Sequence, residues 1–460
     1  MAGLFDRDTN NNCRLLDAGA GIGSLAAAFL DRWVYGGFNF RHVALDAFEI
    51  DEFLHPYLTD IVKRYDNLPY FISTIRNTDF ICAATDCLAG NLFAKPLPKY
   101  THAILNPPYK KIGSNSIYRA LLRQVGIETV NLYTAFVALS LSLLKQRGQL
   151  VAIIPRSFCN GPYYRTFRSF ILKQSAIKRI HLFKSRNKAF KDDEVLQENI
   201  IIHLERGVKQ EAVIISTSTD ANFKDLTIYE YPFERIVFPE DTEQFIHVPT
   251  SFAMNAFELC PSIRYSLSDL AIKVSTGPVV DFRVKKHLRK MPEADTVPLL
   301  YPTHFNNNKS EWPKEGIKKP NAIRRNNETE KWLYPNGFYC VVRRFSSKEE
   351  KRRVVANVVD PFQFPGVAAL GFENRLNVFH NNKQGLPKAL AFGIAMFLNT
   401  TDVDKYFRTF NGHTQVNATD LKRIKYPSRD ALISFGKWAL NQTELTQEII
   451  DNKLEILIDE

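Results

Sequence analysis

The first half of this 460-residue chain is predicted to be an α/β fold, and a mixed α+β region is expected to follow it. Over the first 205 residues short apolar runs alternate with longer helical patterns, as they do in mostly parallel α/β units. Beyond about residue 250, proline, glycine and asparagine become frequent and the apolar runs shorten. The length suits roughly two or three domains.

Each expected strand is a short apolar run that ends near a turn or loop signal. The expected strands are 14–17, 43–48, 102–105, 150–154, 177–183 and 199–204, and the clearest helices are 24–33 and 132–144. Residues 206–250 suggest further strands and then a connector around Pro239. The last part, 443–459, has the apolar spacing of an amphipathic helix. These patterns predict domains at 1–240 and 241–435, and a C-terminal helix within 436–460.

Composition excludes several classes of protein. The chain is 45% hydrophobic and 24% charged, which is a globular balance and not that of a disordered chain. It has neither an apolar run long enough for a membrane span nor a signal-peptide pattern at its start. The six cysteines are scattered, and none of the ten histidines lies in a metal motif, so no metal is expected. A reducing cytoplasm fits this cysteine usage.

The positive charge is concentrated in one segment. Residues 271–430 hold 28 Lys and Arg against 15 Asp and Glu, a net charge of +13, whereas the other 300 residues carry a net charge of −2. A solvated basic face would explain such a stretch. The aromatic and asparagine side chains that accompany the charge favour a nucleic-acid surface instead.

A glycine-rich loop follows the first expected strand, in the sequence LLDAGAGIGSL from Leu15 to Leu25. Glycines allow a tight turn and a close approach of the backbone to a ligand, and the following helix start offers free N–H groups. The spacing differs from that of dinucleotide enzymes, and a purely structural turn is the alternative. Glu49, at the end of the second strand, is well placed to bind a ribose hydroxyl. Together the two features favour a nucleoside cofactor.

The turn Asn106-Pro107-Pro108-Tyr109 follows the expected strand 102–105, at the carboxyl end where open α/β sheets bind ligands. The prolines remove two N–H donors and leave the Pro107 carbonyl and the Asn106 amide oxygen free to accept hydrogen bonds. Tyr109 adds a flat face for stacking. Two acceptors and an aromatic ring suit a planar –NH2 group attached to a ring or a carbonyl.

With these motifs the chain resembles the adenine-N6-specific DNA methyltransferases that use S-adenosylmethionine, in the arrangement with the cofactor motif first and the target-recognition region last. The match covers residues 13 to about 205 well and 240–430 more loosely. It implies a doubly wound, Rossmann-like methyltransferase sheet. It also implies a set of cofactor-binding residues: Asp17, Ala18, Gly19, Ala20, Gly21, Gly23, Glu49, Ile50, Asp79 and Phe80. Asp86 is the alternative to Asp79 for contact with the cofactor's adenine.

The resemblance also implies the chemistry. Asn106 and the Pro107 carbonyl accept hydrogen bonds from the target amino group, so catalysis is positioning and electrostatics without a metal. The catalytic set is therefore the whole tetrad, Asn106 to Tyr109. A base inside a duplex has to be flipped out, and Tyr109 and Phe190 are expected to stack on it, with Phe183 as the alternative to Phe190. The apolar helix that begins with Asn131–Phe136 is most simply core.

The basic segment is then expected to grip and read double-stranded DNA. The candidate contacts are Arg283, Lys285, Lys286, Arg324, Arg325, Arg343, Arg344, the run Lys351–Arg353, and His413 in the loop 412–417. A monomer on DNA and a cognate restriction endonuclease acting on the same site are the expected partners. Family members carry a Thr-Pro segment that helps to close the cofactor pocket, and Met1–Phe5 is expected to be its tail.

Two other functions are compatible with the same motifs. Protein-glutamine and some RNA methyltransferases share the Asn-Pro-Pro-Tyr turn, because a glutamine amide is also a planar –NH2. The long basic C-terminal half argues against them. A methylase-like DNA-recognition subunit with weak turnover is the other alternative, and the intact tetrad argues against it.

Overall fold

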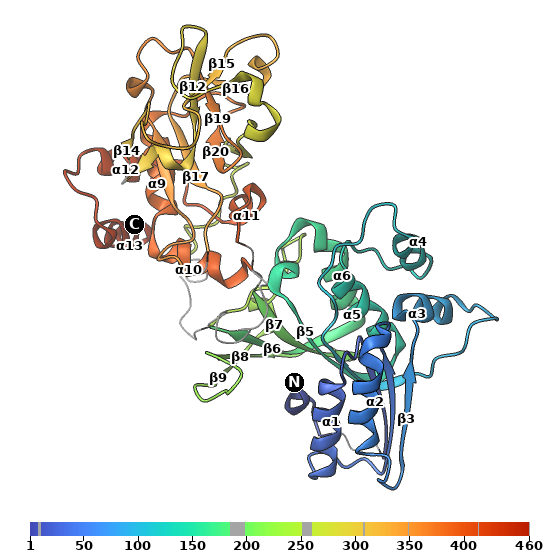
Figure 1. Cartoon of the computed structure of the whole chain (residues 1–460). Helices are drawn as coiled ribbons and strands as arrows, with labels where there is room; N and C mark the ends of the chain where they lie inside the picture. The colour runs from blue at the N-terminus through green and yellow to red at the C-terminus, as the bar shows by residue number, and fades with distance from the viewer. Residues whose placement is uncertain are drawn as a thin grey trace. The chain divides into compact units, whose positions relative to one another are not determined.

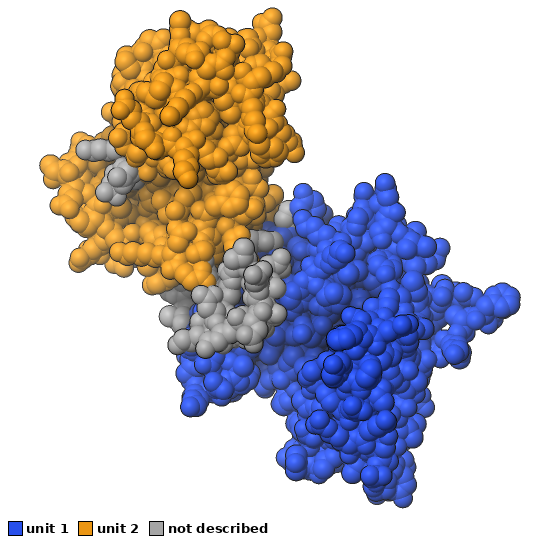
Figure 2. Space-filling view, in the orientation of Figure 1, with its two compact units in different colours: residues 1–252 blue, residues 253–460 orange. Residues whose placement is uncertain are grey.

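Two compact units make up the chain, residues 1–252 and residues 253–460 (Figure 2). The computed structural model describes residues 1–7, 11–184, 198–250, 260–306, 309–347, 349–412 and 414–459. Each unit has hydrophobic cores of its own. None of the helices in these described ranges is long and apolar enough to cross a membrane.

Unit 1 is built on a nine-stranded sheet with the order β3-β2-β1-β4-β5-β7-β6-β8-β9 (Figure 1). The first five strands in this order are parallel, and β7 runs antiparallel between β5 and β6. The strands are β1 (Asn12–Ala18), β2 (His42–Phe48), β3 (Phe71–Arg76), β4 (Tyr100–Leu105), β5 (Leu144–Pro155), β6 (Ser175–Phe183), β7 (Asn199–Arg206), β8 (Val213–Ser218) and β9 (Thr227–Tyr231). All six strands expected from the sequence are present; the sequence predicts no range for β3.

Helices cover both faces of this sheet. They are α1 (Ser24–Val34), α2 (His55–Lys63), α3 (Phe80–Ala89), α4 (Ile117–Gln124), α5 (Leu132–Leu143) and α6 (Arg165–Gln174). Helices α1 and α2 cover one face, and α3, α5 and α6 cover the other (Figure 1). Leu15 of β1 belongs to the core with α1 and α2, whereas its neighbour Leu16 belongs to the core with α3, α5 and α6. Because successive strand residues point to opposite faces, a strand buried on both sides needs apolar residues at both positions. The predicted doubly wound, Rossmann-like α/β fold is confirmed.

Among the described residues, no hydrogen bond or ring contact joins Met1–Phe5 to the glycine loop. The Phe5 ring is buried and its centroid lies 5.4 Å from that of His102, near the amino end of β4. Asp6 N–H donates to Gln149 Oε1 at 2.9 Å, and Arg32 of α1 donates to the Phe5 carbonyl at 2.9 Å. The glycine loop follows the carboxyl end of β1, at the opposite edge of the sheet. The expectation that this segment belongs to the cofactor pocket is therefore not met.

Residues 241–250 pack on unit 1, although the sequence-based boundary placed them in the next domain. Ile246 is fully buried in the core of unit 1 and its N–H donates to the Cys159 carbonyl at 3.0 Å. The buried Arg168 donates to the Glu243 carbonyl at 2.8 Å and to the Phe158 carbonyl at 2.8 Å. The chain therefore turns near Pro239 but stays within unit 1.

Unit 2 combines short strands with helices, as predicted for a mixed α+β region. A four-stranded antiparallel sheet has the order β10-β20-β17-β18, a five-stranded sheet the order β11-β15-β12-β19-β16, and β13 pairs with β14. The strands are β10 (Lys273–Thr276), β11 (Leu288–Arg289), β12 (Thr296–Leu300), β13 (Phe305–Asn306), β14 (Lys309–Ser310), β15 (Ala322–Arg324), β16 (Leu333–Pro335), β17 (Tyr339–Arg343), β18 (Ala356–Val359), β19 (Ala369–Phe372) and β20 (Leu376–His380).

The helices of unit 2 are α9 (Lys388–Leu398), α10 (Thr401–Phe410), α11 (Ala418–Arg423), α12 (Arg429–Leu440) and α13 (Gln447–Asp459). Helices α9 and α12 approach each other very closely, because Gly393 and Gly436 have no side chains. A Cβ on Gly393 would collide with the Leu432 carbonyl, and one on Gly436 with the Ala389 carbonyl. The expected C-terminal helix is α13, and it packs within unit 2: its Asp451 accepts from Thr401 N–H at 2.7 Å.

Candidate active site and nucleic-acid surface

The loop after β1 needs glycine at three positions. Gly19, Gly21 and Gly23 have φ angles of 76°, 56° and 90°, which L-residues with a Cβ rarely adopt. Gly23 is the N-cap of α1, and a Cβ there would also lie 2.8 Å from Leu58. The N–H groups of Gly19 and Ala20 both donate to the Phe48 carbonyl at 2.9 Å, which ties the loop to the end of β2.

Two carboxylates flank this loop. Asp17 is fully buried; its Oδ2 accepts from Ala26 N–H at 3.2 Å, and its Oδ1 has no hydrogen-bond partner among the described residues. Burial raises the pKa of Asp17 to about 7, and the nearby charge of Glu49 adds to the rise. Glu49 accepts from Gly21 N–H at 2.7 Å and from Asp51 N–H at 2.9 Å. The next residue, Ile50, is 61% exposed.

Asp79 lies three residues beyond the end of β3 and is the N-cap of α3. Its Oδ1 accepts from Cys82 N–H at 3.0 Å, and its Oδ2 accepts from the Tyr118 hydroxyl. Phe80 is buried, with its ring centroid 5.2 Å from that of Phe48. Asp86 lies near the other end of α3 and bonds to Asn91. The geometry favours Asp79 over Asp86 as the acid at a strand end.

The tetrad begins directly after β4. Asn106 and Pro108 are exposed, Pro107 is buried and Tyr109 is half-buried. The Tyr109 hydroxyl lies 3.2 Å from Asn106 Oδ1 and 3.3 Å from the Ile153 carbonyl, so it can donate to either. A Cβ built on Gly19 would lie 4.0 Å from Pro108 Cδ. The glycine loop and the tetrad, 89 residues apart in sequence, thus meet at one edge of the sheet.

Aromatic residues of α5, which the sequence predicts only as core, support both motifs. Phe136 of α5 would contact a Cβ on Gly19 at 3.5 Å, and its ring centroid lies 5.1 Å from that of Phe80. Behind the tetrad, the ring of Tyr133 meets Tyr109 edge-on with centroids 6.1 Å apart, and the Tyr133 hydroxyl bonds to Ser157. The apolar helix α5 belongs to the core, as expected. It also packs against both motifs, through Phe136 and Tyr133.

Phe190 and its alternative Phe183 are the two candidates for the second stacking residue. Phe190 lies outside the described residues. Its alternative, Phe183, is buried at the end of β6, where it contacts the ring of His181 with centroids 4.7 Å apart. The structure therefore gives Phe183 a role in packing the core.

The candidate DNA contacts of unit 2 fall into two groups. Four of them meet carboxylates: Lys286 with Glu328, Arg324 with Asp295, Arg325 with Glu330, and Arg343 with Glu350. The side chains of the other group form no ion pair with a described carboxylate. Arg283 and Lys285 are exposed, and neither forms an ion pair with another described residue.

Arg344 also belongs to the second group, because its guanidinium donates to the Asn374 carbonyl and to Gln415 Oε1 at 3.1–3.2 Å, both neutral acceptors. His413 lies outside the described residues.

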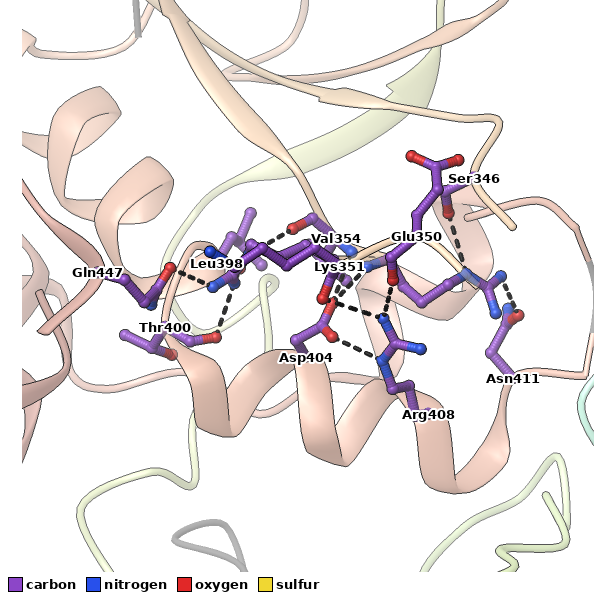
Figure 3. A network of polar contacts seen from close by, with 12 residues as sticks. Ser346, Glu350, Lys351, Val354, Leu398, Thr400, Asp404, Arg408, Asn411 and Gln447 are labelled. Carbon is purple, nitrogen blue, oxygen red and sulfur yellow. Dashed lines mark hydrogen bonds and ion pairs between the residues drawn. The ribbon is translucent and has the colours of Figure 1, made fainter. Parts of the chain in front are cut away.

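The run Lys351–Arg353 is not a DNA contact as a whole, which corrects the expectation from charge alone. Arg353 is only 2% exposed, and its side chain donates to Asn411 Oδ1 at 2.8 Å and to Ser346 Oγ at 3.0 Å. The side chain of Arg352 donates to Gln447 Oε1 at 2.6 Å. The backbone N–H groups of 353 and 354 are held by Asp404, which also pairs with Arg408 (Figure 3). Arg352 and Arg353 join the segment before β18 to α10 and α13.

Comparisons with known proteins identify the family. A family model described as the Eco57I restriction-modification methylase matches residues 91–190, which include the tetrad. The type II methyltransferase M.BsuBI of Bacillus subtilis is 56% identical over 100% of this chain and 91% of its own length. The type II methyltransferase M.PstI of Providencia stuartii is 43% identical over 99% of this chain and 91% of its own.

Two solved structures share the fold. The type IIL restriction-modification enzyme MmeI in complex with DNA matches with a TM-score of 0.53 and 12% identity, over 97% of this chain and 70% of that one. The DrdV–DNA complex matches with a TM-score of 0.50 and 11% identity, over 93% and 54%. The extent and identity of the two full-length matches decide the family: the chain belongs to the type II methyltransferases of restriction–modification systems.

Proposed function

We propose that this chain is a site-specific DNA methyltransferase that transfers a methyl group from S-adenosylmethionine to the N6 amino group of adenine in duplex DNA. The observation that carries the proposal is the meeting of the tetrad Asn106–Tyr109 with the glycine loop at Gly19, at the carboxyl ends of β4 and β1. Family membership supports the methyl transfer, and the +13 charge of residues 271–430 supports a DNA substrate.

The residues around the glycine loop fit the cofactor. Asp17 keeps a buried oxygen without a partner among the described residues, and a Cβ on Gly21 would meet no atom within 4 Å, so ligand atoms can approach there. Asp17 and the backbone from Ala18 to Gly23 would face the methionine part, Glu49 and Ile50 the ribose, and Asp79 with Phe80 the base. When bound, S-adenosylmethionine supplies a methyl group on a positively charged sulfonium.

The tetrad would act by positioning. Asn106 Oδ1 and the Pro107 carbonyl accept the two N–H bonds of the target amino group, which draws its lone pair out of conjugation with the ring. Tyr109 is anchored through the Ile153 carbonyl and the ring of Tyr133, so it presents a fixed face for stacking. Such stacking is worth roughly 1–3 kcal/mol per base, which offsets part of the cost of flipping adenine out of the duplex.

Unit 2 would be the target-recognition domain, and residues 1–252 the catalytic one. Arg283 and Lys285, whose charges are not neutralised by a described carboxylate, are the first candidates for phosphate contacts. Lys286, Arg324, Arg325 and Arg343 would have to exchange their ion pairs for phosphates. We further propose that the enzyme acts as a monomer on DNA in the cytoplasm and protects the site cut by a cognate endonuclease.

The test is transfer of a tritiated methyl group to duplex DNA, with Asn106→Ala as the control variant. We expect label in N6-methyladenine with the wild type and a loss of at least about a hundredfold with the variant, because one of the two acceptors is gone. Label in protein would support a glutamine methyltransferase instead. Binding of DNA without any label would support a recognition subunit.

A further inference from the structure

Asp79 has both of its oxygens engaged. Oδ1 accepts from Cys82 N–H at 3.0 Å and so caps α3, while Oδ2 accepts from the hydroxyl of Tyr118. An ionised carboxylate has about four lone-pair positions, so each oxygen can still accept one more hydrogen bond. The two bonds from the protein therefore fix the plane of the carboxylate and leave it able to accept from a ligand.

Tyr118 comes from the segment that follows the tetrad. It is the second residue of α4, whose N-cap Ser116 accepts from Tyr118 N–H at 3.3 Å. Between the tetrad and α4 the chain is tied to the start of α5, because Leu132 N–H donates to the Lys110 carbonyl at 2.9 Å. The position of the Tyr118 hydroxyl is therefore set by helices α4 and α5 and not by a free loop.

The Tyr118 hydroxyl stays protonated at neutral pH and is therefore a hydrogen-bond donor there. Its hydrogen bond to Asp79 and its burial raise the pKa of Tyr118 to about 12. The Tyr118 side chain is half-buried, and its ring packs against the core of unit 1. A protonated hydroxyl on a packed ring is a fixed partner, and a fixed partner limits the rotation of the Asp79 side chain.

We propose that Tyr118 is a positioning residue for cofactor recognition, which holds the Asp79 carboxylate in the orientation that accepts the exocyclic amino group of the cofactor's adenine. This inference rests on the proposed function, because it takes S-adenosylmethionine as the ligand. Tyr118 does not touch the reacting methyl group. It acts through Asp79, so its removal loosens the recognition of the base without changing the chemical step.

The variant Tyr118→Phe removes only the hydroxyl. We expect the KM for S-adenosylmethionine to rise about tenfold with kcat unchanged, since a hydrogen bond to a charged group is lost. The preference for S-adenosylmethionine over its analogue with a hypoxanthine base should shrink, because that analogue lacks the amino group. Calorimetry with S-adenosylhomocysteine gives the same comparison without turnover. Tyr35→Phe, at a side chain that is 85% exposed, is the matched control.

The double variant Asp79→Asn/Tyr118→Phe tests the inference even if Tyr118→Phe alone lowers the stability of unit 1. In an Asp79→Asn background, removal of the Tyr118 hydroxyl should have little further effect on binding, because the hydroxyl acts through the carboxylate. An equal loss in both backgrounds would overturn the inference. So would a wild type and a Tyr118→Phe variant with the same preference for the adenine base. A wild type that transfers no methyl group at all would instead overturn the proposed function.

Discussion

Replacement of Asp17 by asparagine is expected to stabilise unit 1 at neutral pH while weakening the binding of S-adenosylmethionine. Asp17 is fully buried, and its charge is opposed by burial and by Glu49. A carboxylate held this way is costly to ionise in the folded protein, and the asparagine amide carries no charge. Function and stability thus make opposite demands on this position.

The magnitude follows from the pKa. Asp17 has a pKa of about 7 in the folded protein against the usual value of 3.8, so between these limits the folded state holds a proton that the unfolded state has released. The free energy of unfolding of the wild type therefore falls as pH rises through this window, by about 1.4 kcal/mol per pH unit, and levels off above pH 7. The asparagine side chain does not titrate, so the Asp17→Asn variant should gain about 3 kcal/mol over the wild type between about pH 5 and pH 8.

Urea unfolding at about pH 5, 6, 7 and 8 measures this difference, with amide exchange of the β1 peptides followed by mass spectrometry to report on unit 1 by itself. Titrating groups that do not interact with Asp17 are common to both proteins and cancel in the comparison. If the difference in unfolding free energy between the two proteins does not change with pH, burial does not raise the pKa of Asp17 and the reasoning is refuted. Unchanged binding of the cofactor by the variant would remove Asp17 from the proposed site.

Three further predictions concern unit 2. The double variant Arg283→Ala/Lys285→Ala should reduce the magnitude of the slope of log affinity for DNA against log salt by about 2. Arg325→Ala should change this slope less, because Arg325 is already ion-paired with Glu330. Fluorescence anisotropy over a salt series measures both slopes. Arg353→Ala leaves buried acceptors unpaired, so its unfolding free energy should drop by about 3 kcal/mol in denaturant titrations. Gly393→Ala should lower the melting temperature in calorimetry at a cost of about 1–3 kcal/mol, because its Cβ collides with α12; no decrease would mean that the helices can separate.

The sequence was sufficient for the parts of the site that are local. The sequence predicts the tetrad at a strand end because the residues directly before it, Ala103–Leu105, are apolar, and β4 does end at Leu105. The sequence does not predict the edge strand β3 (Phe71–Arg76), because most of its side chains are not buried and it lacks the apolar run of its neighbours. Because no strand end is predicted there, the sequence leaves both Asp79 and Asp86 as candidates for the acid that contacts the cofactor's adenine.

Contacts between distant residues could not be predicted. Tyr118 lies 39 residues from Asp79, and neither residue has a local pattern that indicates the other. In unit 2 many strands have two to five residues, and their pairing joins segments as far apart as β10 and β20, so spacing alone specifies no topology. Charge alone also cannot distinguish the buried Arg353 from an exposed cation such as Arg283.

The close crossing of α9 and α12 constrains how this protein can change over time. Each helix places a backbone carbonyl where the other would need a side chain, so neither Gly393 nor Gly436 can be exchanged while the opposite helix stays where it is. A substitution at one glycine is not relieved by a smaller residue at the other, since glycine is already the smallest. We therefore expect both positions to stay glycine together in descendants of this sequence, even where exposed surface loops diverge.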